Sequence, residues 1–373
     1  MNALLVLLAA TSLVALVLVP WLRSRGRLQD GRRAVGATAG PALDPAVGYG
    51  FVPPEELDVR LPGPDADLEE ALEALRTSGD WRYAAQLLAA TGEDGERRWQ
   101  RVQTLAGAAV FELGRASGAG AAWLRSWRAE APKDPGAAQT QAQFLALRAM
   151  RDPGSQDFRM LLEEARTVCR EAGLLAPGSP LPYLTDLVVA RGLGERAADY
   201  EALWSEVARR APHHMGAHLA ALPYWSQKWH GSRSQAEAFA ERAASQAPRG
   251  TLLPALPLFA VYEHLPEANL VRGLYQSAVV ERAIEGAHFA LREAPADHPV
   301  APHVRHLLAW FLVRAERYAE ALEQLRLVDG HVGAVPWSYS GDPVAQYVSY
   351  RAVAVAGYES LGGNATTFQP PGL

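Results

Sequence analysis

The residues best suited to chemistry lie in one nine-residue stretch, Tyr-Trp-Ser-Gln-Lys-Trp-His-Gly-Ser, at positions 224 to 232. Lys228 is one of only two lysines in the chain, and it stands beside aromatic rings that attract a cation through their faces. A cationic anchor flanked by aromatic side chains is suited to holding a small ligand or a peptide. We therefore predict a ligand-binding site that consists of Tyr224, Lys228, Trp229 and His230.

The same stretch also has a structural interpretation. Trp225 and Trp229 are four residues apart, so they share one face if the preceding helix continues that far, and they would then fill the gap between neighbouring helices. Gly231 suits a turn with positive φ. Ser232 or Ser234 can cap the helix that follows.

Metal and catalytic chemistry find little support in the sequence. His214 and His218 are spaced to reach one metal ion, but a zinc site needs three or four converging ligands, and the single cysteine, Cys169, offers no cluster. Carboxylates such as Glu163 and Glu164 alternate with arginines along helices, as on solvated faces. We expect no catalytic residue and no metal site.

Other function classes are excluded by composition and motif. The net charge of −5, with both signs interspersed, gives no basic patch for nucleic acid. The chain contains no glycine-rich phosphate loop, no Walker lysine and no nucleophile elbow. We therefore expect no cofactor and no nucleic-acid partner.

The elements that must position these residues are helices arranged in pairs. From residue 67 onward apolar residues follow a helical period, and the dipeptide Ala-Pro recurs at intervals of roughly 35 to 47 residues, the range of paired-helix repeats. Proline cannot continue a helix, so each landmark ends a second helix and turns the chain into the next pair. The landmarks are Ala131-Pro132, Ala176-Pro177, Ala211-Pro212, Ala247-Pro248 and Ala294-Pro295.

These landmarks, together with apolar periodicity, predict the helices individually. The expected helices cover 67–75, 81–90, 97–113, 121–131, 137–150, 156–175, 181–190, 197–211, 215–227, 234–247, 252–264, 272–294, 300–315, 318–329 and 343–361. Gly362-Gly363 is expected to end the last of them.

Within single pairs the spacing of small and aromatic residues resembles that of tetratricopeptide repeats. Leu308-Ala309, Leu312, Tyr318 and Ala321-Leu322 follow that pattern, and Gly79-Asp80-Trp81 begins a similar one. The resemblance implies an all-α, tetratricopeptide-like solenoid over residues 67 to 361. Such arrays present a concave surface to peptides or proteins, and Trp310, Tyr347 and Tyr350 are candidate anchors on it.

The stretch at 224 to 232 adds a second resemblance. It is similar to a Tyr-x-x-x-Lys-Trp-x-Gly-Ser signature found in an uncharacterised bacterial family with tetratricopeptide-like helices, and it matches at Tyr224, Lys228, Trp229, Gly231 and Ser232. This resemblance implies a fold and no particular chemistry.

The N-terminus predicts a membrane anchor. Residues 3 to 22 are apolar apart from two hydroxyl side chains, and about 20 such residues span a bilayer. Trp21 falls at the interfacial end, and arginines occur only after the span, from Arg23 onward. The positive-inside rule then places the body in the cytoplasm. A cleaved signal peptide is the alternative, but the segment lacks a basic start and a clear cleavage site.

Segments outside the helices complete the domain plan. Residues 1 to 27 form the anchor with its basic flank, and residues 28 to 66 are rich in glycine and proline, which predicts a flexible linker. Phe51 and Val52 within the linker are candidates for local docking on the folded body. Residues 362 to 373 are expected to form a loose tail.

The functional expectation follows from this plan. We expect a non-enzymatic protein-interaction scaffold, anchored by one transmembrane helix at the cytoplasmic face of a bacterial membrane, with a protein or peptide partner. The first alternative is a small-ligand or peptide sensor that uses the turn from Tyr224 to Ser232. The second alternative is an enzyme with an unusual helical active site.

Overall fold

The computed structural model describes residues 44–92, 95–115, 120–265 and 273–368. Within these residues the chain forms fifteen α-helices and no β-strand, which confirms the predicted all-α class. The chain divides into two compact units: the described part of unit 1 runs from Asp65 to Ala301, and that of unit 2 joins residues 44–64 to residues 302–368.

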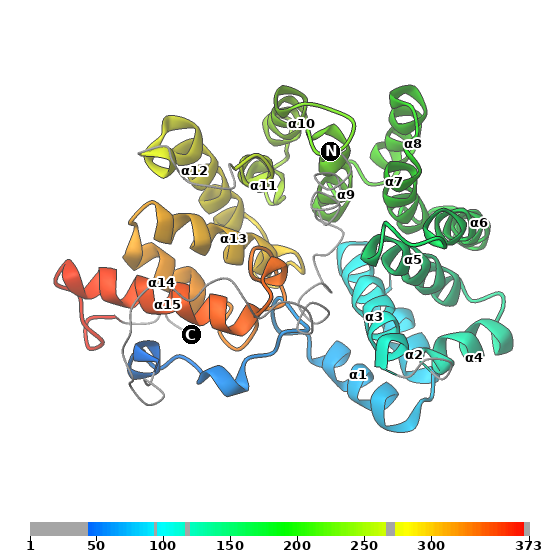
Figure 1. Ribbon diagram of the computed structural model, residues 1–373, viewed down its shortest axis with the longest axis horizontal. Helices are drawn as coiled ribbons and strands as arrows, with labels where there is room; N and C mark the ends of the chain where they lie inside the picture. The colour runs from blue at the N-terminus through cyan, green and yellow to red at the C-terminus, as the bar shows by residue number, and fades with distance from the viewer. Residues whose placement is uncertain (1–43, 93–94, 116–119, 266–272, 369–373) are drawn as a thin grey trace. The chain divides into compact units, whose positions relative to one another are not determined.

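Unit 1 is a succession of helix pairs, which run from cyan through green to yellow in Figure 1. Its helices are α1 (Ala66–Ser78), α2 (Arg82–Thr91), α3 (Gly95–Arg115), α4 (Ala122–Glu130), α5 (Pro135–Arg151), α6 (Phe158–Leu175), α7 (Leu181–Leu193), α8 (Ala197–Arg210), α9 (Met215–Ala221), α10 (Arg233–Ser245), α11 (Leu256–Glu263) and α12 (Ala278–Glu293).

The Ala-Pro landmarks end helices as predicted. Ala131, Ala176, Ala211 and Ala294 are the residues that follow α4, α6, α8 and α12, and each is followed by its proline. Several predicted helices are shorter than expected: α10 ends at Ser245, and α11 begins only at Leu256, after a 3-10 turn. The helix that starts at Met215 changes to a 3-10 turn at Leu222, and α12 begins only at Ala278, after a separate 3-10 turn.

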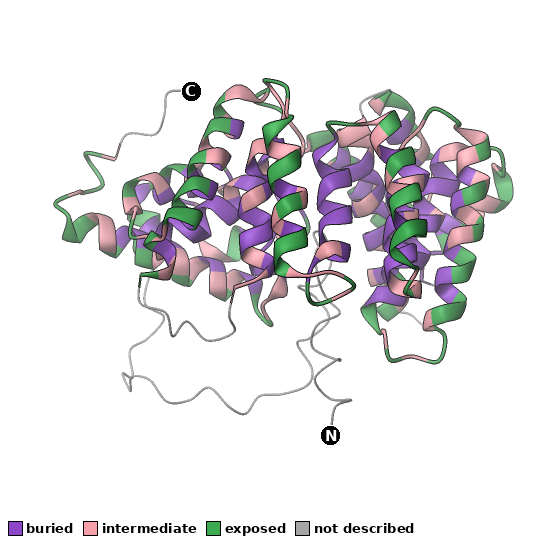
Figure 2. Cartoon of the chain, turned by 90° about the horizontal axis from the view of Figure 1, so that it is seen from above, coloured by how far each residue is buried: buried purple, intermediate pink, exposed green. Residues whose placement is uncertain are grey.

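The two helices of a pair differ in burial, as the purple and green bands of Figure 2 show. The first helices of the pairs, such as α5 and α9, are buried around most of their circumference, and all seven residues of α9 are buried. The second helices, such as α6, bury one face only, with Leu161, Ala165 and Cys169 among the buried residues. Apart from α1, which buries one face only, the first helices of unit 1 therefore form an inner layer that the second helices cover.

Contacts in the inner layer go beyond neighbouring pairs. Helix α3 packs on α5, α5 on α7 and α7 on α9, and α3 also contacts α9. In an open solenoid each repeat touches only its neighbours. The contact between α3 and α9 is thus a departure from the simplest form of the expected array.

Unit 2 contains α13 (Ala301–Arg314), α14 (Tyr318–Arg326) and α15 (Pro343–Ser360). Trp310 and Tyr347, expected as anchors on a binding surface, are both buried, and Tyr350 lies against Trp310 with ring centroids 6.1 Å apart. These aromatic residues belong to the core of unit 2.

We predicted that residues 28 to 66 form a flexible linker. For the residues of this range that the structure describes, the prediction is wrong, because residues 44 to 64 fold onto helices of unit 2. Asp44 forms a buried ion pair with Arg351 of α15, whose guanidinium also donates to the carbonyl oxygen of Val52 at 3.0 Å. Phe51 is buried beside them, as the docking prediction expected. Main-chain bonds join Asp58 to Gly330 and Val332, each at 2.8 Å.

The C-terminal tail is also not loose over its described residues. Phe368 lies 6.0 Å from the Tyr49 ring and 6.4 Å from the Phe51 ring, measured between centroids. Helix α15 ends before Gly362, which adopts a positive φ of 90° as predicted for a glycine at a helix end.

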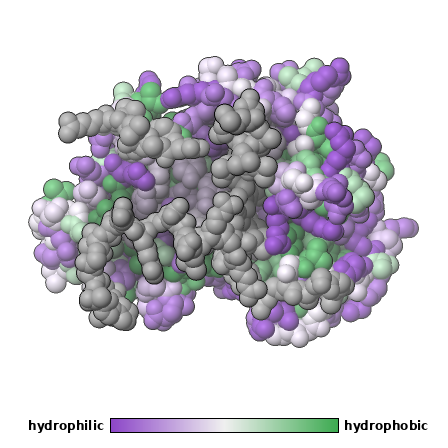
Figure 3. All heavy atoms as spheres, viewed as in Figure 1, coloured by the Kyte–Doolittle hydropathy of each residue, from purple (hydrophilic) through white to green (hydrophobic). Residues whose placement is uncertain are grey.

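No described helix is long and apolar enough to cross a bilayer. The predicted anchor, residues 3 to 22, lies outside the described residues. Polar residues cover much of the described surface on the face that Figure 3 shows. Leu174 and Met160 are among the large apolar side chains that stay exposed.

Candidate functional site

Tyr224, one of the four predicted ligand-binding residues, is a packing residue. Its ring is buried and stacks on Tyr200 of α8 with centroids 3.6 Å apart. Its hydroxyl donates to the carbonyl oxygen of Glu195 at 2.9 Å. One face of the Tyr224 ring is covered and its hydroxyl is hydrogen-bonded, so Tyr224 packs on the buried side of the turn.

The turn itself is closed by main-chain hydrogen bonds. The His230 amide donates to the Tyr224 carbonyl at 3.2 Å, and the Gly231 amide donates to the Ser226 carbonyl at 3.1 Å. Because the 3-10 helix ends at Trp225, Trp225 and Trp229 do not share a helical face.

Gly231 is required for a different reason from the one predicted. Its φ is not among the positive values in the described chain, but a Cβ at this position would collide with the carbonyl oxygen of Trp225. Glycine therefore permits the close approach of two backbone segments. Ser232 then caps α10 by accepting from the Gln235 amide at 3.2 Å, as one of the two predicted caps.

Trp229 and His230 both hold the turn against α7. The guanidinium of Arg191, which is fully buried, lies 4.8 Å from the Trp229 ring centroid, within cation–π range. The His230 Nε2 lies 3.3 Å from the Arg191 carbonyl oxygen. Trp229 is half-buried and His230 is exposed, so both keep a side toward solvent.

Lys228 lies over a buried carboxylate. Its Nζ is 3.6 Å from Oε2 of Glu263 at the end of α11, and the two side chains are 45% and 2% exposed respectively. Burial raises the pKa of Glu263, and the nearby charges of Lys228 and Arg191 offset only part of this rise. The structure thus brings Lys228, Trp229 and His230 together at the surface of the turn, above Tyr224.

His214 and His218, whose spacing could reach one metal ion, have structural contacts. The His214 ring caps α9, and the His218 ring lies 4.9 Å from that of Trp204, edge to face. Over the described ranges, no group of three or more His, Cys, Asp and Glu side chains is placed to hold a metal ion.

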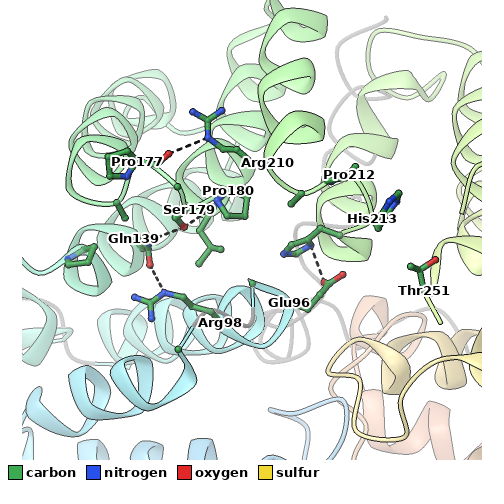
Figure 4. Close-up of a pocket in the computed structure, with 18 of the residues that line it drawn as sticks. Glu96, Arg98, Gln139, Pro177, Ser179, Pro180, Arg210, Pro212, His213 and Thr251 are labelled. Carbon is green, nitrogen blue, oxygen red and sulfur yellow. Dashed lines mark hydrogen bonds and ion pairs between the residues drawn. The ribbon is translucent and has the colours of Figure 1, made fainter. Parts of the chain in front are cut away.

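A cavity of about 970 Å³ lies at the end of unit 1 where successive helix pairs are joined (Figure 4). We call it the loop-end cavity. Its walls come from the starts of α3 and α5 and from the connections α6–α7, α8–α9 and α10–α11. Residues that line it include Glu96, Arg98, Gln139, Pro177, Gly178, Ser179, Arg210, Pro212, His213, His214 and Thr251.

Polar side chains fix one wall of the loop-end cavity. Arg98 donates from Nε to Oε1 of Gln139 at 3.1 Å, and Gln139 donates from Nε2 to the Ser179 hydroxyl at 3.3 Å. Gln139 is buried, while Pro212 and His213 on another wall are exposed. One wall of the cavity therefore carries hydrogen-bonded polar side chains, and another wall is open to solvent.

Sequence reasoning missed the loop-end cavity, although a signal was present. Two of the Ala-Pro dipeptides, Ala176-Pro177 and Ala211-Pro212, line this cavity. In the sequence we interpreted them only as the ends of helices. Equivalent turns of stacked pairs lie on the same end of an array, so residues next to the landmarks were candidates for a shared site.

Comparisons of the chain with protein-family models, with curated proteins and with solved structures each gave no match. The resemblances to tetratricopeptide repeats and to the uncharacterised bacterial family therefore remain predictions from the residues quoted above.

Proposed function

We propose that this chain is a non-enzymatic protein-interaction scaffold, anchored in a bacterial membrane by its N-terminal helix, with a cytoplasmic body built as a tetratricopeptide-like array. The partner is a protein or a peptide segment. The observation that carries the proposal is the loop-end cavity, because it is assembled from several consecutive helix pairs.

Two features of unit 1 support a binding role. The pairs stack in chain order with an inner and an outer layer, which is the arrangement that repeat proteins use to present extended surfaces. The cavity volume of about 970 Å³ is at the upper end of the range of pockets that enclose small ligands, roughly 300 to 1,000 Å³, and it suits a short peptide segment.

Filling the loop-end cavity tests the proposal. Gly178 is an exposed lining residue, and a Cβ added there meets no atom within 4 Å, so Gly178→Trp adds a large side chain to the cavity wall without a clash at Cβ. Gly341 in unit 2 is equally exposed and equally open, so Gly341→Trp is the matched control. Crosslinking and pull-down from native membranes should recover a partner with wild type and control, and at least tenfold less with Gly178→Trp.

Recovery of no specific partner by the wild type would count against the scaffold. Equal recovery by Gly178→Trp and Gly341→Trp would exclude the loop-end cavity as the binding site. Circular dichroism of each variant shows whether its helices are retained, so that a folding defect is not mistaken for lost binding.

The membrane part of the proposal has its own prediction. The apolar run at residues 3 to 22 and the arginines that follow it support an anchor with the body in the cytoplasm. We expect a reporter that requires the cytoplasm to be active when it is fused after Leu373, and a reporter that requires the outside of the membrane to be inactive there. Activity of a reporter that works only outside the membrane would overturn the topology.

A ligand or peptide sensor at the turn is the second candidate. It is favoured by the accessibility of Lys228, Trp229 and His230, which face solvent above the buried Arg191 and Glu263. If a partner is retained by Gly178→Trp but lost in Lys228→Ala, the turn is the binding site in place of the cavity.

A further inference from the structure

One ring nitrogen of His214 has two partners that require opposite proton states. The Nδ1 atom accepts a hydrogen bond from the Ala217 amide at 3.1 Å, which makes His214 the N-cap of α9. The same Nδ1 lies 3.0 Å from Oε2 of Glu96. Accepting from an amide needs a bare nitrogen, whereas bonding to a carboxylate needs a proton on it. A single proton state satisfies only one partner.

Glu96 occupies this position because it stands in the first turn of α3. Its carboxylate accepts from the amides of Met215 and Gly216, the latter at 3.2 Å, so it binds the exposed donors at the start of α9. Burial tends to raise the pKa of Glu96, but the charge that His214 carries when protonated, the hydrogen bond between the two side chains, the nearby His298 and the Gly216 amide together lower this pKa. When the ring is protonated, the carboxylate is therefore ionised and accepts the hydrogen bond that the ring donates.

We propose that His214 is a proton-operated switch at the contact between α3 and α9. With Nδ1 bare, the ring caps α9 and the hydrogen bond stays within that helix. With Nδ1 protonated, the ring donates to Glu96 and adds one bond to the two that this carboxylate already makes with the start of α9. The Ala217 amide then keeps the backbone carbonyl of His214, 3.1 Å away, as its acceptor. Acid therefore tightens the link between α3 and α9 without uncapping α9.

Several other titratable or charged groups face the switch. Glu96 approaches from α3 and His298 from the segment before α13, while His213 and His218 flank the ring on its own segment. Arg98 and Arg210 line the adjoining cavity. Burial lowers the pKa of His218 to about 4, so His218 stays neutral above pH 5. Glu96, His214 and His298 also line the loop-end cavity, so the switch lies in the wall of that cavity.

The first test is a double-mutant cycle in the full-length chain. Glu96→Gln removes the charge, and His214→Asn keeps an N-cap acceptor but cannot be protonated. The coupling between the two sites should be about tenfold in the unfolding equilibrium at pH 5.5 and less than threefold at pH 8. A parallel cycle of Glu96 with His298 is the control and should show a smaller change with pH. Equal coupling of Glu96 and His214 at both pH values would overturn the proposal.

The second test uses the wild-type chain, so it does not depend on whether a variant folds. Nitrogen-15 shifts of the His214 ring in the wild-type chain report the proton on each ring nitrogen. At pH 8 we expect Nδ1 bare and Nε2 protonated, and at pH 5.5 we expect both protonated. A proton on Nδ1 at pH 8, or a bare Nδ1 at pH 5.5, would show that no switch operates.

Discussion

Asp44→Ala should destabilise unit 2 by about 3 to 5 kcal/mol, the usual cost of removing one partner of a buried ion pair. Arg351 is fully buried, and Asp44 supplies the carboxylate that its Nε meets at 3.0 Å. The remaining carboxylate, Asp329, lies 3.3 Å from another guanidinium nitrogen, and burial raises its pKa despite Arg351. Without Asp44 a buried cation keeps only partial compensation.

Hydrogen exchange of the α15 amides in the full-length chain measures this loss directly. The matched control is Arg233→Ala, which removes the exposed pair with Glu237, whose side chains are 60% and 37% exposed, and should change stability by less than about 1 kcal/mol. Adding Arg351→Met to Asp44→Ala should recover part of the loss, because the buried charge is then gone. If Asp44→Ala leaves α15 protection unchanged, residues 44 to 64 do not hold unit 2 together as described.

This ion pair also explains why the predicted linker was wrong. Composition captures whether a segment can form a core by itself, and residues 28 to 66 with their prolines and glycines cannot. Asp44 and Arg351 are 307 positions apart, so nothing local indicates that they meet. The helices, in contrast, were predictable from local sequence. Proline, glycine and the spacing of apolar residues each determine helical structure within one or two helical turns.

The candidate site at the turn was predictable only in part. The distinctive composition of residues 224 to 232 pointed to a segment in which Lys228 and His230 are exposed and Trp229 is half-buried. The stacking of Tyr224 on Tyr200 was not visible, because the two rings come from different helix pairs. The burial of Glu263 beneath Lys228 likewise depends on how α11 packs against the turn. Local sequence identifies such a segment, but packing decides which of its side chains are free to bind.

Acid should destabilise this protein well before its carboxylates are protonated. Burial is the main cause that lowers the pKa of three histidines from the usual 6.5, to about 4 for His218 and His303 and to about 3 for His306. The unfolded chain then binds more protons than the folded one below pH 6.5, so stability falls as the pH decreases toward these values. Each histidine should contribute a loss of about 2 kcal/mol between pH 7 and pH 5.

His306 is the histidine whose protonation has the clearest structural cost. Its Nε2 lies 2.8 Å from the Pro62 carbonyl oxygen, and its Nδ1 accepts from the Trp337 indole at 3.0 Å. The neutral ring with its proton on Nε2 satisfies both neighbours. A second proton would have to enter at Nδ1, where it meets the N–H of Trp337 and displaces that hydrogen bond.

The free energy of unfolding of the full-length chain, measured at pH 7 and pH 5, should therefore depend on pH differently in His306→Gln and in its control. The glutamine lowers stability at pH 7, because it cannot reproduce both bonds, but it removes about 2 kcal/mol of the acid-induced loss in unit 2. His213→Gln replaces an exposed histidine of unit 1 and should leave the pH dependence of unit 2 unchanged. If His306→Gln loses as much stability as the wild type between these pH values, protonation of His306 is not a source of acid sensitivity, and His303 becomes the residue to examine in unit 2.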